Sequence, residues 1–330
     1  MMRKFIVFAV LSPLVLQVVA MEPAMEDAIR HGAMAKICYR VIDDEGCPVS
    51  NAVAHVWFSS YARHQDDADW LVTTDTNGMF TVEHRTNASL DCGFDKDGYY
   101  HSSDQILFRD RKDVPVKVRD GKWQPYGEMR TVVLKKIKNP GTCIIPKQGG
   151  QFTWNIPAFG QWIGFDFEDF DWTAPYGCGK STDILLKFQS KCNRRFVDYE
   201  YEMDVCFTNY QYAGAYVCGL DKYSDLEIPY CANTNSEFRT SFHFVMKKSP
   251  AQRIMECVEQ DQCLVFRTRT ALDDNGNLKT AHYGVIVGMW GFGDKQMGVG
   301  DACFNIIEND VNIEDGRTLR DKIKNYKKER

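Results

Sequence analysis

The fold is predicted from two stretches of sequence. The first is Glu45-Gly46-Cys47-Pro48-Val49-Ser50-Asn51-Ala52-Val53, and the second, after a polar loop, is Thr74-Asp75-Thr76-Asn77-Gly78-Met79-Phe80. Gly46-Cys47-Pro48 predicts a turn that enters a strand, because Gly permits positive φ and Pro fixes φ while lacking a ladder donor. Asn77-Gly78 predicts a tight hairpin turn, since both residues tolerate positive φ and strand-like residues flank them. The two signals together predict a first region built from strands.

The first region runs from about residue 36 to residue 138. Its strands are predicted from β-branched and aromatic residues at alternating positions, at 37–42, 53–58, 80–83 and 132–134. The spacing Gly-x-Pro-Val-x-x-Ala-x-Val from Gly46, followed by Thr-Asp-x-x-Gly-x-Phe from Thr74, resembles the carboxypeptidase regulatory-like domain. The resemblance covers residues 36–137. It implies a transthyretin-like, seven-stranded β-sandwich that serves as a spacer or binding module beside another activity.

Residues 1–20 have the pattern of a secretory signal peptide. Arg3 and Lys4 precede an apolar run from Phe5 to Ala20, and small residues favour cleavage after Ala20, with Ala24 as the second choice. A signal helix that is never cleaved is the alternative. Nothing later reaches about 18 consecutive apolar residues, so the sequence predicts no membrane span after cleavage and a secreted or periplasmic protein.

The composition is that of an ordinary globular chain. Its 330 residues, 44% of them hydrophobic and 26% charged, are enough for two domains. A net charge of -5 disfavours nucleic acid as a partner, because binding to phosphate backbones needs concentrated Lys and Arg. Basic residues gather only in residues 313–330, a predicted short amphipathic helix or solvated tail.

The chain holds 12 cysteines, an even number that permits disulfides in an exported protein. Spacing does not decide which cysteines pair, and free buried thiols are the alternative. The absence of any Cys-x-x-Cys pair argues against a metal cluster or a thioredoxin-like site.

Turn-rich residues 139–150 form a predicted linker to a second β-rich region, residues 151–312. Residues 198–205 alternate carboxylates with apolar groups, and residues 263–287 form a hairpin with its tip at 273–277. With no helical period before residue 313, the sequence predicts a second antiparallel β-sandwich or a jelly-roll-like domain. Three short stretches are loosely similar to uncharacterised exported proteins of Verrucomicrobiota and Lentisphaerota: 171–180, 266–269 and 281–284.

Known chemical motifs are scarce. Residues 174–182 fit a loose phosphate-binding loop, but acidic residues fill the strand before it and a strand follows it, so a Gly-rich turn is the better interpretation. Oxygen-rich turns at 95–98 and 273–277 lack the twelve-residue calcium loop. The sequence contains no nucleophile elbow and no zinc-protease motif. We therefore expect no metal and no cofactor, and the sequence predicts no oligomeric state.

Four carboxylates, Asp166, Glu168, Asp169 and Asp171, interleave with aromatic residues and are the candidates for catalysis. A glycosidase needs two carboxylates on either side of an aromatic cleft. The alternative is an edge strand with Asp166 and Glu168 on its wet face and the Phe side chains buried.

Aromatic residues offer flat apolar faces that a sugar ring can cover, and the candidates are Trp154, Trp162, Trp172, Tyr176 and Trp290. Trp172 and Tyr176 flank a Gly-rich turn and are the expected ligand-binding pair, with core packing as the alternative. The leading hypothesis is an exported, non-catalytic binding or surface-associated protein whose ligand is a glycan or cell-surface polymer. The alternative is a carbohydrate-active or other hydrolase with its site in the second region. Converging carboxylates in a cleft would favour the enzyme, and an exposed aromatic strip would favour binding.

Overall fold

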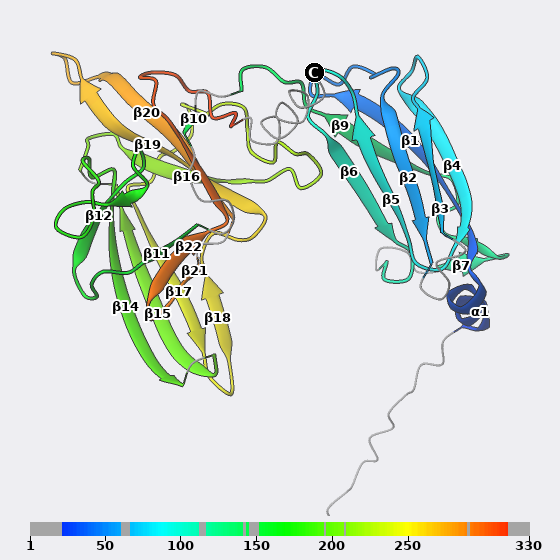
Figure 1. Cartoon of the computed structure of the whole chain (residues 1–330), viewed down its shortest axis with the longest axis horizontal. Helices are drawn as coiled ribbons and strands as arrows, with labels where there is room; N and C mark the ends of the chain where they lie inside the picture. Colours follow the sequence, from blue (N-terminus) through cyan, green and yellow to red (C-terminus); the bar gives the residue numbers. More distant parts are fainter. Residues whose placement is uncertain are drawn as a thin grey trace, which may run out of the picture.

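The computed structural model describes residues 22–60, 67–111, 117–140, 143–144, 152–194, 196–207, 209–288 and 291–315. These residues form an almost all-β protein, as the sequence predicts (Figure 1). The predicted signal peptide, the basic residues of the tail and Trp290 lie outside the described residues. Within them, no helix has the length and apolar character of a membrane span.

One short helix, α1 (Pro23–His31), precedes the first strand and lies outside the two regions for which the sequence predicts strands. Pro23 occupies the first turn, where its missing N–H costs nothing. Ala28 is buried, and Glu26 pairs with Arg30 one turn later. Met25, Ala28 and Ile29 recur at helical spacing, although nine residues are a short run for this signal.

The first region contains two sheets whose inner faces share one hydrophobic core. One sheet has the order β4-β1-β8-β7, with β9 paired in parallel to β1; the other has the order β3-β2-β5-β6. Alternate residues of each strand point inward, as in β2, where Ala54, Val56 and Phe58 are buried. The strands described are β1 (Ala33–Asp43), β2 (Val53–Ser59), β3 (Ala68–Thr73), β4 (Met79–Thr86), β5 (Ser89–Asp95), β6 (Ser102–Leu107), β7 (Val118–Arg119), β8 (Lys122–Trp123) and β9 (Glu128–Leu134).

The turn at Asn77-Gly78 is not a hairpin. It joins β3 to β4, which belong to different sheets. Gly78 has φ +72, whereas Asn77 does not take positive φ. The Asp75 carboxylate accepts the backbone N–H groups of Asn77 and Met79, both at 2.8 Å, and so fixes the turn. The predicted turn is present, but its role is to carry the chain from one sheet to the other.

The second region contains three sheets around a larger core. Their orders are β13-β12-β14-β15-β17-β18, β10-β23-β20-β19-β16 and β11-β22-β21. The hairpin between β19 and β20 is confirmed. The strands described are β10 (Cys143–Ile144), β11 (Phe152–Asn155), β12 (Trp162–Asp166), β13 (Asp171–Trp172), β14 (Ile184–Arg194), β15 (Asp198–Cys206), β16 (Gly214–Gly219), β17 (Ser241–Lys248), β18 (Arg253–Glu256), β19 (Gln262–Leu272), β20 (Leu278–Val287), β21 (Gly291–Phe292), β22 (Gln296–Val299) and β23 (Asp301–Asn305).

A third buried cluster joins the two regions. Tyr100 lies between β5 and β6 of the first region, yet it packs with Leu226 and Ile228 of the second. Its hydroxyl donates to the fully buried Glu314 at 2.8 Å. Backbone bonds reinforce the contact, since the Ser103 N–H donates to the Tyr223 carbonyl at 2.7 Å. Apolar packing and hydrogen bonding therefore hold the regions together.

Candidate functional site

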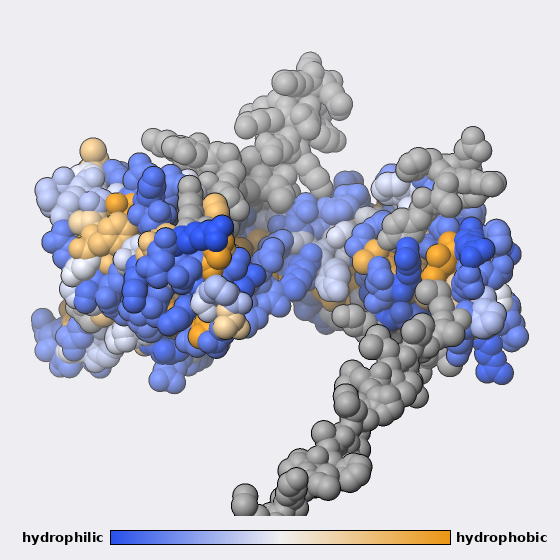
Figure 2. Space-filling model, turned by 90° about the horizontal axis from the view of Figure 1, so that it is seen from below, coloured by the Kyte–Doolittle hydropathy of each residue, from blue (hydrophilic) through white to orange (hydrophobic). Residues whose placement is uncertain are grey.

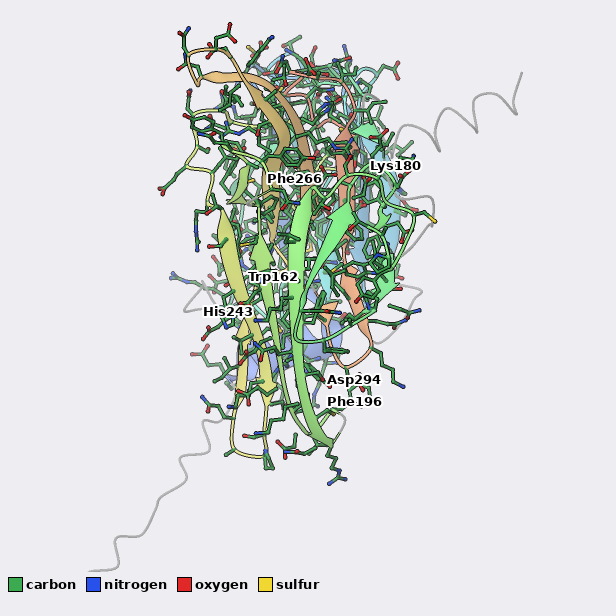
Figure 3. All side chains as sticks on the ribbon, turned by 90° about the vertical axis from the view of Figure 1, so that its left-hand side faces the viewer. Trp162, Lys180, Phe196, His243, Phe266 and Asp294 are labelled. Carbon is green, nitrogen blue, oxygen red and sulfur yellow. The ribbon has the colours of Figure 1, made fainter. Side chains whose placement is uncertain are left out.

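The outer face of the six-stranded sheet carries a straight row of side chains. Trp162 of β12 lies opposite Lys187 of β14, Lys187 opposite Asp204 of β15, and Asp204 opposite His243 of β17. Inward neighbours such as Phe188, Met203 and Phe244 are buried, so alternation directs the row to solvent. Figure 3 labels Trp162 and His243 on this sheet.

Two large aromatic side chains are exposed at one end of the row. Trp162 is 46% exposed and Tyr176 is 39% exposed. The Gln161 amide donates to the Tyr176 hydroxyl at 2.5 Å, which ties the loop bearing Tyr176 to the start of β12. Lys187 Nζ lies 5.9 Å from the centre of the Trp162 ring, and His243 Nδ1 lies 2.7 Å from Asp204 Oδ1. We call Trp162, Tyr176, Gln161 and the row Lys187, Asp204 and His243 the platform.

The loop of residues 173–183, which carries Tyr176, is held in place by hydrogen bonds to carboxylates. Backbone N–H groups of Lys180 and Ser181 each donate to Asp166 Oδ2 at 2.8 Å. The Cys178 N–H donates to Asp171 Oδ2 at 2.8 Å. A Cβ on Gly177 would lie 2.4 Å from the Trp172 carbonyl oxygen, so only glycine fits there. The loop resembles a phosphate-binding loop because its N–H groups do converge on an anion, but the anion is the protein's own carboxylate.

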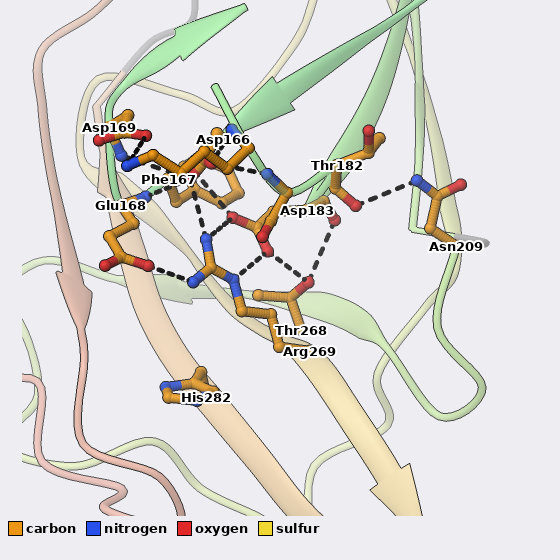
Figure 4. A network of polar contacts seen from close by, with 12 residues as sticks. Asp166, Phe167, Glu168, Asp169, Thr182, Asp183, Asn209, Thr268, Arg269 and His282 are labelled. Atoms are coloured by element: carbon orange, nitrogen blue, oxygen red, sulfur yellow. Dashed lines mark hydrogen bonds and ion pairs between the residues drawn. The ribbon is translucent and has the colours of Figure 1, made fainter. Parts of the chain in front are cut away.

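Arg269 completes this arrangement from β19 (Figure 4). Its guanidinium contacts both oxygens of the fully buried Asp183, at 2.9 and 3.0 Å, and Asp166 Oδ1 at 2.8 Å. The Nη1 group of the same guanidinium donates to Glu168 Oε2. Burial would raise the pKa of Asp166, but the N–H groups of Ser181, Glu168, Lys180 and Asp169 outweigh it and hold the pKa below its usual range.

The structure gives the four predicted catalytic carboxylates a scaffolding role. The expectation that Asp166 lies on a wet face is wrong: it is 1% exposed, because loop N–H groups and Arg269 replace water around it. Glu168 pairs with Arg269, and Asp169 pairs with Lys180 at 3.2 Å. Asp171 binds the Trp172 and Cys178 N–H groups. Each carboxylate holds the protein's own loop, and this is not the arrangement of two opposed groups astride a cleft.

The expected aromatic pair is not presented as a pair. Trp172 is 4% exposed in the core, where its indole N–H donates to the Asn155 carbonyl at 2.9 Å. Its position in β13, paired with β12, directs the ring inward against Phe165. Trp154 is partly buried and donates to the Phe170 carbonyl. Of the described candidates, Trp162 and Tyr176 are the exposed ones. Trp162 faces solvent because it lies opposite Lys187 of β14, a strand pairing that the sequence alone does not reveal.

A separate hollow of about 690 Å³ lies between residues 225–228 and the strands β22 and β23. Asp225, Glu227 and Asp301 make its lining acidic, while four glycines bring backbone to its surface. Burial, followed by repulsion from Asp221 and Asp225, raises the pKa of Glu227. The hollow therefore repels anionic ligands.

One group in the described part of the chain has metal-like spacing: Asp43, Glu45 and Cys47, whose ligand atoms lie within 4.8 Å of one another. Lys136 Nζ already lies 2.8 Å from Asp43 and 3.4 Å from Glu45. Asp43 also accepts the Glu45 and Cys47 N–H groups. The group is thus a turn whose carboxylates already share a cation and backbone N–H donors.

No protein-family model matches the chain, and no curated protein matches it in sequence. Among solved structures, it is similar to 3-chlorocatechol 1,2-dioxygenase from Rhodococcus opacus 1CP, with 16% identity, a TM-score of 0.26, and 32% of this chain and 61% of that chain covered. Hydroxyquinol 1,2-dioxygenase from Pseudomonas putida DLL-E4 has 16% identity and a TM-score of 0.24, with 32% of this chain and 57% of that chain covered. Wild-type catechol 1,2 dioxygenase from Acinetobacter radioresistens has 13% identity and a TM-score of 0.25, with 34% of this chain and 54% of that chain covered. The chain spans little more than half the length of these proteins, and similarity this distant says nothing about its function.

Proposed function

We propose that this is an exported, non-catalytic binding protein that holds a glycan on the platform. The observation that carries the proposal is the exposure of two aromatic rings, Trp162 on β12 and Tyr176 in the loop that Gln161 ties to the start of β12. Side chains on rigid elements lose little freedom on binding, so their contacts convert efficiently into affinity. The face of the molecule seen in Figure 2 is mostly hydrophilic, with separate apolar patches.

The chemistry of the platform suits a neutral or weakly charged sugar polymer. Ring faces cover the apolar side of a pyranose, while Lys187, Asp204 and His243 offer donors and acceptors to its hydroxyl groups. Lys187 and Asp204 are adjacent and opposite in charge, which gives no net preference for a polyanion. The net charge of -5 adds to this selection.

The test is a glycan array followed by calorimetry with wild type, Trp162→Ala and Tyr176→Ala. Each ring contributes about 1 to 3 kcal/mol, so each variant should weaken binding by roughly five- to hundredfold. Both side chains are exposed, so the variants should keep the unfolding midpoint of the wild type.

Two controls make the result specific. Trp57→Ala removes a Trp that is 48% exposed on the first region and should leave binding unchanged. Glu227→Gln alters the acidic hollow without touching the platform. Loss of binding with Glu227→Gln, or no binding by wild type to any glycan, would overturn the proposal.

A further inference from the structure

Two cysteines lie opposite each other on neighbouring strands, β16 and β19, at one edge of the sheet β10-β23-β20-β19-β16. Cys218 of β16 lies directly opposite Cys263 of β19, and their sulfur atoms are 3.0 Å apart. Cys263 is fully buried and Cys218 is partly exposed. We propose that Cys218 and Cys263 are an oxidation site that forms a disulfide across the two strands.

The backbone already satisfies the geometry of the bond. Directly opposite residues of antiparallel strands have Cα atoms roughly 4.5 or 5.5 Å apart, inside the range of roughly 4.4 to 6.8 Å found for disulfides. The sulfurs need to approach by only about 1 Å to reach bonding distance. Rotation of the two side chains supplies that movement without a shift of β16 or β19.

Exposure separates this pair from a second pair of neighbouring cysteines, Cys143 and Cys303. Both of those thiols are buried, and each donates to a backbone carbonyl oxygen, at 3.7 and 3.6 Å. The side-chain hydrogen bond between Cys303 and Cys143, followed by complete burial, raises the pKa of Cys303, so no thiolate forms there readily.

The hydrogen bond between Cys218 and Cys263 has the opposite effect on its accessible member. It lowers the pKa of Cys218, and the same bond together with burial raises the pKa of Cys263. Cys218 is thus both the accessible thiol and the one that becomes a thiolate first.

The reaction balances with a small disulfide such as oxidised glutathione. The Cys218 thiolate attacks one glutathione sulfur, and the glutathione S–S bond breaks to release one glutathione thiolate, which takes up the Cys218 proton. Cys263 then loses its proton and attacks Cys218 Sγ, releasing the second glutathione as a thiol. The protein loses two electrons and two protons, and oxidised glutathione gains both.

The location gives the bond a structural consequence. β16 is the edge strand of its sheet, and the chain continues from Cys218 into residues 220–228. That segment forms a wall of the acidic hollow and contacts the first region, where the Asp225 N–H donates to the His101 carbonyl at 2.8 Å. The disulfide would anchor the start of this segment to β19, the strand next to the edge.

The experiment maps the bond directly in the full chain. A Cys206→Ser, Cys257→Ser background leaves Cys218 alone in tryptic peptide 196–222 and Cys263 alone in peptide 254–267. After incubation with oxidised glutathione, remaining thiols are alkylated and the peptides are analysed by mass spectrometry without reduction. The expected result is a linked 196–222/254–267 species that disappears on reduction. Both peptides recovered alkylated, or either linked to another cysteine, would overturn the proposal.

A thermal melt gives an independent measurement. In the same background, reduction should lower the melting temperature of the oxidised protein by about 5 to 10 °C, because the bond closes a loop of 45 residues. Cys218→Ser should lose the part of this temperature shift that the Cys218–Cys263 bond contributes. Cys192→Ser, which removes an exposed cysteine on another sheet, is the control and should keep it. An equal shift in the Cys218→Ser and Cys192→Ser proteins would contradict the bond.

Discussion

At the scale of the residue, Arg269 is the side chain on which the loop beneath the platform depends. It has φ +48, and the pairing of β19 with β20 is irregular between Thr268 and Ala271. Such irregularities redirect a side chain out of the alternating pattern. Here the guanidinium turns toward Asp183 and Asp166, whose charges are buried. The local backbone strain is offset by a bidentate, charge-assisted pair.

We expect Arg269→Ala to destabilise the protein by about 3 to 5 kcal/mol, because it leaves Asp183 buried without its counter-charge. Arg269→Lys should recover only part of this, since an ammonium cannot contact both carboxylate oxygens in one plane. Arg267→Ala is the comparison: it removes a hydrogen bond to the Tyr212 carbonyl and a contact with the Phe238 ring but strands no buried carboxylate, so it should cost about 1 kcal/mol. Denaturant unfolding measures all three. If Arg267→Ala and Arg269→Ala lower the free energy of unfolding equally, the network of Arg269 with Asp183 and Asp166 contributes little to stability.

At the scale of the element, two turns of the same sequence type do different work. Asp75 to Met79 joins two sheets, and Asp273 to Asn277 closes the β19–β20 hairpin. In each, the Asp carboxylate accepts two backbone N–H groups and the glycine has positive φ. The surroundings differ. A Cβ on Gly78 would lie 2.3 Å from the Val41 carbonyl oxygen, whereas a Cβ on Gly276 would meet nothing within 4 Å.

This difference predicts unequal effects for the same substitution. Gly276→Ala should cost about 1 to 2 kcal/mol, the strain of positive φ alone. Gly78→Ala should cost at least about 2 kcal/mol more, because the new methyl group meets backbone that cannot rotate away. Chemical denaturation followed by tryptophan fluorescence compares the two variants. Similar midpoints would show that the sheets shift freely at Val41.

At the scale of the whole molecule, the Tyr100 hydroxyl and Glu314 couple the two regions. Glu314 also accepts the N–H groups of Lys138 at 3.0 Å and Asn139 at 2.7 Å, so one buried carboxylate binds both regions and the segment between them. Turn-rich residues 139–150 predicted a linker, yet β10 within this stretch pairs with β23. Of residues 139–150 the structure describes 139–140 and 143–144, and the latter two form the strand β10 of the second region's sheet.

Tyr100→Phe should destabilise the protein by about 1 to 3 kcal/mol, because a buried carboxylate loses a donor. Hydrogen exchange should quicken at the Ser103 and Asp225 amides, whose acceptors lie across the contact. Tyr39→Phe removes the same kind of bond, from Tyr39 to Asp104 within the first region, and should leave those two amides protected. Unchanged exchange in Tyr100→Phe would show that apolar packing alone joins the regions.

Alternation and turn chemistry carried most of what the sequence could predict. Residues 198–205 gave β15 its correct inward face, and Asp273 to Asn277 gave the tip of the hairpin, because both signals are local. The sequence could not show that Asp166 is buried, since its partners Arg269 and the 180–181 backbone are distant or lie in a loop. The choice between Trp162 and Trp172 likewise depends on which neighbouring strand each faces. Such long-range pairings leave no periodic trace in the chain.

The pairing of β10 with β23 also sets an order of folding during synthesis. The first region can complete its sheets once residue 134 has emerged, because β1 finds β9 within that length. β10 must wait for residue 305 before it has a partner, a separation that makes closure slow. Between the emergence of β20 (Leu278–Val287) and that of β23, the β20 edge that later receives β23 is an open strand that can pair with a neighbouring chain. A nascent second region therefore depends on being kept apart from its copies until its final strand arrives.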